Sequence, residues 1–217
     1  MRARSRVELE KPVAKLGVPS ISKEFMPEAD ESPLGQLVAD AILHAGRTSG
    51  AQIAFTNTGG LRTSLDAGAG NVVTAGQVQA PIPFGNEIVV LTMSGAQIVA
   101  LLEQQWDGNE PEKRGLLQVS AGFTYSWNTE KPKGQRIVRD SVRLNGVPIE
   151  DGASYHVAVF NFLADGNDGF VTFRQASKRV ATSVGDVDAL RSYLIRLEQD
   201  HQPAGSNGAV PRIIRIK

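Results

Sequence analysis

The chain has 217 residues, of which 41% are hydrophobic, and its 23 Lys and Arg are balanced by 23 Asp and Glu. This length fits one large domain or two small ones, and the apolar content is sufficient for a packed core. The balanced charge gives no general attraction to nucleic acids or to membrane surfaces, so any anion site has to be local. The chain has no cysteine, which excludes disulfides, a cysteine nucleophile and thiolate metal sites.

The N-terminal half alternates predicted helices and strands. Ser32 is a suitable N-cap and Pro33 a suitable first residue for an amphipathic helix that Gly46 can end. Its apolar face is predicted to hold Leu34, Leu37, Val38, Ala41 and Ile42. A buried strand is predicted over residues 52–56, a second helix after Thr74 and a second strand over residues 87–93. Ser94 is predicted to cap a third helix, whose apolar face holds Ile98, Leu101, Leu102 and Trp106.

The C-terminal half is richer in strand signals. Alternation of Phe123, Tyr125 and Trp127 with polar residues predicts a half-buried strand, and Asn145-Gly146 predicts a hairpin turn. A further strand is predicted over residues 155–160 and a closing strand over residues 211–217. Asp186 is predicted to cap the last helix, which uses Val187, Leu190, Tyr193, Leu194 and Leu197. Interleaved helices, strands and hairpins indicate an α/β (mixed α+β) domain.

Three loops carry residues suited to binding, although each has an ordinary structural explanation. Asn57–Arg62 follows a strand and combines an amide, two glycines and a guanidinium that suits phosphate, yet a tight turn with a solvated arginine explains it equally well. Loop 81–86 places Phe84 between proline and glycine, where it is either a plug over the sheet end or a platform for stacking a base.

The third loop, Asn161–Phe170, is the most informative. It holds Asp165, Asn167 and Asp168 among glycines, and it lacks the distal glutamate of an EF-hand calcium loop. A carboxylate that accepts hydroxyl hydrogen bonds favours ribose binding, and the alternative is an Asx-rich turn. Together, two phenylalanines, an aspartate and an arginine point to a ligand with a flat ring, a diol and a phosphate, which is a nucleotide.

At these motifs the sequence resembles the C-terminal domain of 5'-nucleotidases and UDP-sugar hydrolases. The matching segments are Glu31-Ser32-Pro33-Leu34-Gly35 with Asp40-Ala41, Asn57–Arg62, Pro83-Phe84-Gly85-Asn86, and Asn161-Phe162-Leu163-Ala164 through Gly166–Phe170. The resemblance runs from about residue 12 to about residue 200. The turn reads Asn-Thr-Gly-Gly-Leu-Arg where relatives often have Asn-Gly-Gly-Gly-Ile-Arg, so both polar residues are kept.

The resemblance implies layered mixed sheets with flanking helices, and it implies roles for seven residues. Phe84 and Phe162 would clamp the base, and Asp168 would hold the ribose. Asn57 and Arg62 would contact the nucleoside and the phosphate. Arg47 is the nearest match to a further family arginine, and Asn86 stands where relatives vary between Asn and Gly.

The resemblance also implies a division of labour between two domains. The metals, a pair of divalent ions, would belong to an N-terminal metallophosphatase domain that is the partner of this one. This chain has only three histidines, no G-x-S-x-G elbow and no P-loop, so we expect neither a catalytic residue nor a cofactor or metal site in it. Residues 1–30 are then a linker or N-terminal extension, and residues 31–217 are the substrate-binding domain.

Location and exact role are less directly readable. No apolar run is long enough for a membrane span, and the N-terminus lacks the apolar stretch of a signal peptide. The sequence fits either a cytoplasmic protein or a fragment, and the resemblance favours a fragment of an extracytoplasmic hydrolase. Alternatives are a free-standing nucleotide-binding module, the same domain from a UDP-sugar hydrolase or cyclic-nucleotide phosphodiesterase, and an interaction domain that has kept the fold without the site.

Overall fold

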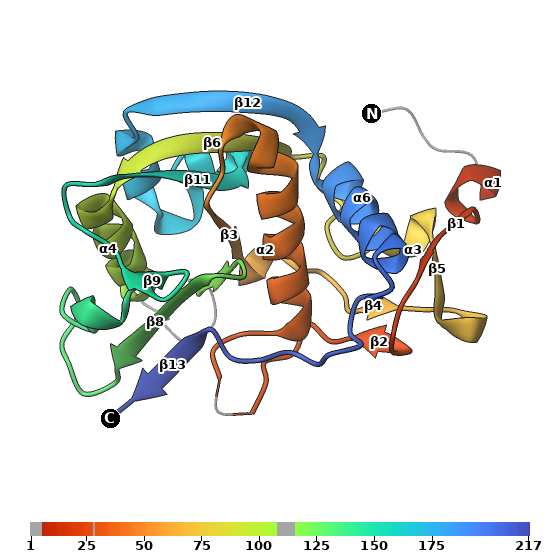
Figure 1. Ribbon diagram of the computed structural model, residues 1–217, viewed down its shortest axis with the longest axis horizontal. Coiled ribbons are helices and arrows are strands. Elements are labelled where there is room, and N and C mark those ends of the chain that lie inside the picture. The colour runs from red at the N-terminus through yellow and green to blue at the C-terminus, as the bar shows by residue number, and fades with distance from the viewer. Residues whose placement is uncertain (1–5, 28, 108–115) are drawn as a thin grey trace.

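The computed structural model describes residues 6–27, 29–107 and 116–217. Its central element is a five-stranded mixed sheet with the strand order β12-β6-β11-β3-β7 (Figure 1). The strands are β3 (Ile53–Asn57), β6 (Glu87–Ser94), β7 (Leu117–Val119), β11 (Ser154–Phe160) and β12 (Lys178–Gly185). Strand β11 runs parallel to β3, and the other neighbouring strands are antiparallel. This arrangement confirms the predicted mixed α/β fold.

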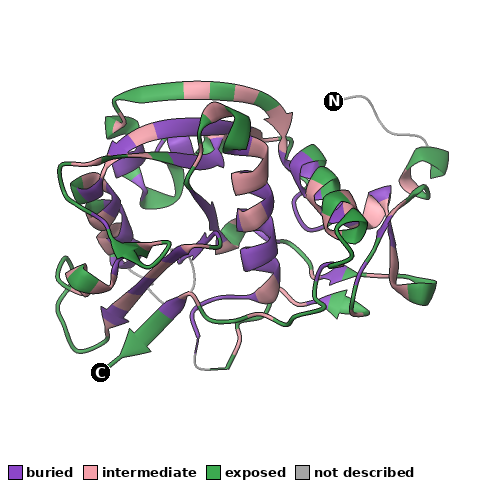
Figure 2. Cartoon of the chain, in the orientation of Figure 1, coloured by how far each residue is buried: buried purple, intermediate pink, exposed green. Residues whose placement is uncertain are grey.

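Both faces of the central sheet are covered. Helices α2 (Pro33–Gly46) and α6 (Asp186–Gln199) pack on one face, and α4 (Gly95–Glu103) lies on the other. Successive residues of β6 alternate between the two cores, with Val89 in the α4 core and Val90 in the α2 core. Figure 2 shows the consequence: β6 and β11 are largely buried, whereas the edge strand β12 is mostly exposed.

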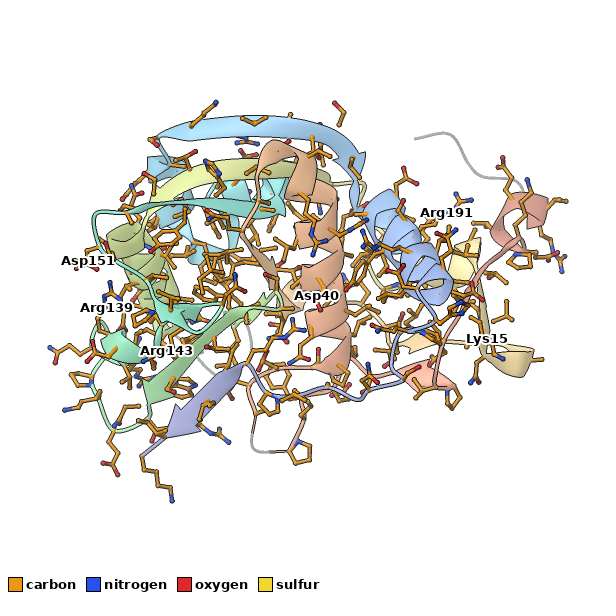
Figure 3. The ribbon with its side chains drawn as sticks, in the orientation of Figure 1. Lys15, Asp40, Arg139, Arg143, Asp151 and Arg191 are labelled. Carbon is orange, nitrogen blue, oxygen red and sulfur yellow. The ribbon has the colours of Figure 1, made fainter. Side chains whose placement is uncertain are left out.

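A second sheet, in the order β10-β9-β8-β13, closes the α4 side. Its strands are β8 (Phe123–Asn128), β9 (Arg143–Leu144), β10 (Val147–Pro148) and β13 (Ile213–Ile216). The predicted hairpin joins β9 to β10, with positive φ at Asn145 (51°) and Gly146 (80°). The predicted closing strand is β13, which pairs in parallel with β8. Beside this sheet Arg139 and Asp151 form a surface ion pair (Figure 3).

Two short strand pairs complete the fold. Strand β1 (Pro12–Lys15) pairs with β5 (Val72–Thr74), and β2 (Ser20–Ile21) pairs with β4 (Leu65–Asp66). Part of the segment predicted to be a linker is therefore packed, since Leu16 is 1% exposed. The boundary placed at residue 31 stays a prediction.

The remaining helical segments are short. They are α1 (Arg6–Leu9), α3 (Ala75–Gln79), α5 (Asn161–Ala164) and the 3₁₀ turns η1 (Arg47–Ser49), η2 (Thr58–Gly60), η3 (Ala69–Asn71), η4 (Gln104–Trp106), η5 (Arg139–Ser141), η6 (Asn167–Gly169) and η7 (Val171–Gln175). Trp106 thus lies beyond the end of α4, although it is buried as predicted. Within the described ranges no helix is long and apolar enough to cross a membrane.

Two of the three predicted helix caps, Ser32 and Ser94, are confirmed, and Thr74 is a further cap that was not predicted. Side-chain oxygens of Ser32, Thr74 and Ser94 accept hydrogen bonds from the first turns of α2, α3 and α4. The prediction that Asp186 caps α6 is wrong, because Gly185 occupies the N-cap position and Asp186 is the first helical residue. The Asp186 carboxylate instead turns toward a neighbouring loop.

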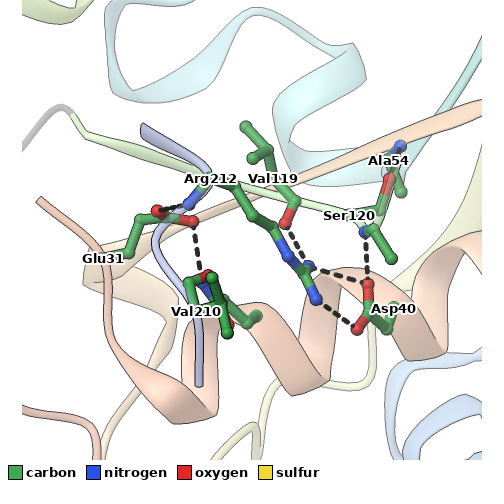
Figure 4. Close-up of polar contacts among 9 residues, drawn as sticks. Glu31, Asp40, Ala54, Val119, Ser120, Val210 and Arg212 are labelled. Carbon is green, nitrogen blue, oxygen red and sulfur yellow. Dashed lines mark hydrogen bonds and ion pairs between the residues drawn. The ribbon is translucent and has the colours of Figure 1, made fainter. Parts of the chain in front are cut away.

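A buried polar network attaches the C-terminal segment to α2 (Figure 4). Arg212 makes two 2.8 Å hydrogen bonds to the carboxylate of Asp40 and a 2.7 Å bond to the carbonyl of Val119. The carboxylate of Glu31, which is 0% exposed, accepts hydrogen bonds from the backbone N–H groups of Arg212 and Ile213. The buried carboxyl group of Glu31 and the partly buried side chains of Arg212 and Asp40 thus all have hydrogen-bonding partners, as burial of charge requires.

Candidate functional site

The three loops singled out in the sequence meet at one edge of the central sheet. Parallel pairing of β11 with β3 puts Asn57 and Asn161 at neighbouring strand ends. Antiparallel pairing of Phe160 with Ile88 places the start of β6, and the loop before it, at the same edge. The topology thus joins segments that are separated by up to about a hundred residues in the chain.

Hydrogen bonds connect these loops to one another. The backbone N–H of Arg62 donates to the carbonyl of Pro81 at 2.9 Å. The Oδ1 atom of Asn161 accepts from the backbone N–H groups of Glu87 at 3.2 Å and Phe162 at 3.0 Å. The loop of residues 81–86, which is the middle loop of the three in the sequence, is therefore held on both sides. The Asn57–Arg62 turn holds one side and the Asn161–Phe170 loop holds the other.

Asn57 and Asp168 form the polar centre of the edge. The Nδ2 atom of Asn57 donates to Oδ2 of Asp168 at 2.6 Å, and Asn57 is only 5% exposed. Asp168 is exposed and adopts positive φ (54°), which aspartate tolerates better than most residues. Gly60 leaves room for this pair, because an added Cβ there would lie 3.0 Å from Oδ1 of Asn57. The carboxylate is thus oriented by a buried amide while it faces solvent.

Two phenylalanine side chains flank this centre and remain exposed. Phe84 is 43% exposed and Phe162 is 39% exposed, although other phenylalanines such as Phe170 are fully buried. The guanidinium carbon of Arg62 lies 4.8 Å from the ring centroid of Phe84, within range of a cation–π interaction. Aromatic rings left in solvent beside polar groups are typical of a binding surface.

The loop that carries Phe162 and Asp168 is fixed by polar contacts. Nδ2 of Asn167 donates to the carbonyl of Phe162 at 2.8 Å. Nε of Arg174 donates to the carbonyl of Asp165 at 2.6 Å, and Arg179 pairs with the Asp165 carboxylate at 2.6 Å. Asp165 is therefore engaged in holding the loop, which leaves Asp168 as the exposed acid beside Asn57.

Six of the seven predicted residues share this edge, and Arg47 does not. Arg47 is exposed in η1, between the end of α2 and the start of β3, whereas Asn57 is at the opposite end of β3. Its segment lies instead beside the start of β11, where the ring of His156 contacts the carbonyl of Gly50 at 3.2 Å. Asn86 is half-buried within the middle loop.

The hydrogen-bond partner of Asn86 was not predicted from the sequence. The backbone N–H of Asn86 donates to Oδ2 of Asp186 at 2.8 Å. Asp186 therefore binds the loop that contains Asn86, although its position at the start of a helix had suggested a cap. Burial raises the pKa of Asp186 above its ordinary value of 3.8, against the opposing effect of backbone hydrogen bonds. Asn161, which joins two loops through one oxygen, was likewise recognised only as part of a motif.

The chemistry available at this edge is that of binding. It offers two rings, a carboxylate, an amide and a guanidinium, which suit a ligand with a flat apolar part, hydroxyl groups and negative charge. Among the residues that the structure describes, no three His, Asp or Glu side chains are grouped so that they could hold a metal ion.

Comparison with known proteins gives consistent matches. Residues 12–175 match the family model described as the 5'-nucleotidase, C-terminal domain. A trifunctional nucleotide phosphoesterase of Bacillus subtilis is 36% identical over 68% of the chain, and a cell wall protein of Listeria monocytogenes is 33% identical over 81%. The crystal structure of a 5'-nucleotidase precursor from Thermus thermophilus superposes on 97% of the chain with a TM-score of 0.82 at 32% identity.

The chain is much shorter than these proteins. It spans 10% of the Bacillus protein, 22% of the Listeria protein and 40% of the Thermus chain. The similarity therefore concerns one part of larger molecules.

Proposed function

This chain belongs to the 5'-nucleotidase C-terminal domain family, and we propose that it binds the nucleoside part of a nucleotide for hydrolysis of its phosphate ester. The observation that carries the proposal is the placement of two exposed rings, Phe84 and Phe162, beside the hydrogen-bonded pair of Asn57 and Asp168. A base has two flat faces and a ribose has a diol, so this combination of groups fits both parts of a nucleoside.

Each residue has a distinct part in the proposed complex. The rings of Phe84 and Phe162 stack on the base, an interaction that tolerates any base because each has a π-face. Asp168 accepts hydrogen bonds from ribose hydroxyls, and Asn57 holds its carboxylate in place through the 2.6 Å contact. Arg62 meets the phosphate, since its guanidinium presents a fork that matches phosphate oxygens. Arg47 lies too far along the sheet to join them.

The hydrolysis itself belongs to another part of the full-length protein in this proposal. A separate N-terminal metallophosphatase domain would supply a pair of divalent metal ions, whose chemistry would be to polarise the phosphate and activate a water. The described part of this chain contributes binding groups and no grouped metal ligands. Because a similar protein in Listeria is described as a cell wall protein, we also propose that the full-length protein acts outside the cytoplasm.

Titration calorimetry of this chain with adenosine and with AMP tests the binding role. Half of a two-domain site is expected to bind weakly, with a Kd of about 1 mM, or about 4 kcal/mol. Phe162→Ala should weaken both ligands by about 1–3 kcal/mol, because one of the two stacking rings is lost. The matched control is Ile214→Ala, which removes an apolar side chain of 52% exposure from β13 in the second sheet.

The two ligands separate the roles of the residues. Arg62→Ala should reduce the affinity for AMP more than that for adenosine, because only AMP carries the phosphate. Equal binding by wild type and Phe162→Ala would contradict the proposed site, and saturable binding lost equally in Ile214→Ala would indicate an unspecific effect. UDP-glucose and 2',3'-cyclic AMP in the same assay would distinguish the alternative substrate classes.

A further inference from the structure

Asp186 is a buried acid that no part of the binding site accounts for. It is the first residue of α6 and is 3% exposed. Its Oδ2 atom accepts a 2.8 Å hydrogen bond from the backbone N–H of Asn86, and its own N–H donates to the carbonyl of Asn86 at 2.9 Å. The bonds run in both directions, so the backbone of Asn86 is docked on the N-terminus of α6.

The carboxylate is well supplied with donors for a buried charge. Its Oδ1 atom accepts from the N–H of Val187 at 2.8 Å, and the N–H of Gly85 also stabilises the ionised form. The partial positive charge at a helix N-terminus favours an anion at this position. Burial acts against these contacts and raises the pKa of Asp186, because it disfavours the charged form.

The docked residue is next to a flexible point of the loop. Gly85 separates Asn86 from Phe84 and adopts a left-handed conformation (φ 71°) that glycine takes readily. On the other side, the N–H of Glu87 donates to Oδ1 of Asn161, the same oxygen that accepts from Phe162. Two side-chain acceptors, Asn161 within the site and Asp186 behind it, therefore hold the C-terminal side of the Phe84 loop, while Arg62 holds its start at Pro81.

We propose that Asp186 is a positioning residue that fixes the Phe84 loop on helix α6 and so sets the spacing of the two rings that receive the base. This inference rests on the proposed function. Asp186 itself does not touch the ligand, because it is buried beneath the loop. Its contribution is to hold Phe84 before the ligand arrives, which reduces the ordering that binding requires.

The chain offers a matched control for this residue. Asp188 lies in the same first turn of α6, but it is exposed. Asp188→Asn removes the same negative charge from the same helix terminus, and only Asp186→Asn also replaces one of the two buried acceptor oxygens, which bind Asn86 and Val187, with an NH2 donor. Both variants lose one negative charge at the N-terminus of α6, so that effect is common to them. A difference in adenosine affinity between Asp186→Asn and Asp188→Asn therefore reports on the contact with the loop.

The test combines adenosine titration by NMR with amide hydrogen exchange in the wild type, Asp186→Asn and Asp188→Asn. Asp186→Asn should lower adenosine affinity about tenfold, the effect expected for loss of a charged hydrogen-bond acceptor. It should also accelerate exchange at Gly85 and Asn86 while exchange in the middle of β6 stays unchanged. Asp188→Asn should leave both measurements within about twofold of the wild type.

A double mutant separates positioning from a general structural effect. In a Phe84→Ala background the ring is absent, so Asp186→Asn should have no further effect on adenosine affinity. Additive losses would overturn the proposal, as would an unchanged affinity or unchanged exchange at Asn86 in Asp186→Asn. Failure of the wild type to bind adenosine would instead overturn the proposed function on which the inference rests.

Discussion

Glu31 shows how a single buried acid can hold two distant segments together. Its Oε2 atom accepts from the backbone N–H groups of Arg212 at 2.5 Å and Ile213 at 2.6 Å, and its Oε1 atom accepts from Nε2 of Gln36 at 3.1 Å. The N–H groups of Arg212 and Ile213 lie at the start of β13, so they depend on this side chain for an acceptor. One carboxylate thus replaces the pairing that a neighbouring strand would otherwise supply.

We expect Glu31→Ala to be severely destabilising. The substitution removes the acceptor of the backbone N–H groups of Arg212 and Ile213, whereas Gln36 keeps its bond to the carbonyl of Val210. Breaking such a buried arrangement costs about 3–5 kcal/mol in the free energy of unfolding. Urea unfolding measures the loss, and Glu24→Ala at an exposed position should stay within about 0.5 kcal/mol of the wild type. A loss for Glu31→Ala no larger than that of the control would contradict the assigned role.

The ionisation of Glu31 predicts how stability depends on pH. Burial raises the pKa of Glu31 above 4.5, while backbone hydrogen bonds from Ile213 and Arg212 oppose the rise. The folded state therefore binds this proton more tightly than the unfolded state. The resulting stabilisation is complete below pH 4.5 and is lost as pH rises through the raised pKa of the folded state.

Comparison with Glu31→Gln isolates this contribution, because other titrating groups are common to both proteins. The free energy of unfolding of the wild type minus that of Glu31→Gln should decrease from pH 4.5 upward and become constant above the folded-state pKa. Urea unfolding at a series of pH values gives the difference directly. A difference that increases with pH would show that hydrogen bonding outweighs burial at this carboxylate.

Candidate site residues could be proposed from the sequence, but their contacts could not. The motifs pointed to Asn57, Asp168 and both phenylalanines, yet nothing in the sequence shows that Nδ2 of Asn57 lies 2.6 Å from a carboxylate 111 positions away. The position of Arg47, away from the other six residues, could not be predicted for the same reason. Proximity in sequence to the first helix says nothing about which end of β3 the arginine reaches.

At the scale of elements, local signals were the most reliable. The caps Ser32 and Ser94 were predicted correctly because a cap bonds to residues two or three positions away. The order β12-β6-β11-β3-β7 was not, since pairing between distant strands depends on the whole fold. Asp186 combines a local and a distant signal. Its position at the start of a helix was predicted correctly, but its hydrogen-bond partner, Asn86, lies in another loop and was not predicted.

Helix α4 offers a direct test of a local signal. The hydroxyl of Ser94 accepts from the N–H of Gln97 at 3.2 Å, and Oε1 of Gln97 accepts from the N–H of Ser94 at 2.8 Å. Ser94→Ala should lower the free energy of unfolding by about 1 kcal/mol because one of these bonds is lost. Ser94→Thr keeps the oxygen and should recover most of it. Equal losses in both variants, measured by thermal unfolding, would assign the effect to packing rather than capping.

At the scale of the whole molecule, one sheet separates two apolar cores. Side chains of α4 and the second sheet fill one core, and those of α2 and α6 fill the other. Strands β3, β6 and β11 contribute alternate residues to both, with Phe55 in the first core and Ala54 in the second. Neither core can lose its packing without exposing the strands that the other needs, so we expect the described domain to unfold in one cooperative step.

Substitutions on opposite faces of the sheet test this cooperativity. Ile98 in α4 and Leu190 in α6 are both 0% exposed, and replacing either by alanine should cost about 2–5 kcal/mol. Trp106 and Trp127 lie in the α4 core with ring centroids 4.8 Å apart, so tryptophan fluorescence reports on that core alone. For both variants the urea midpoint from fluorescence should coincide with that from far-UV circular dichroism. A Leu190→Ala protein whose fluorescence transition stays at the wild-type midpoint would show that the two cores unfold independently.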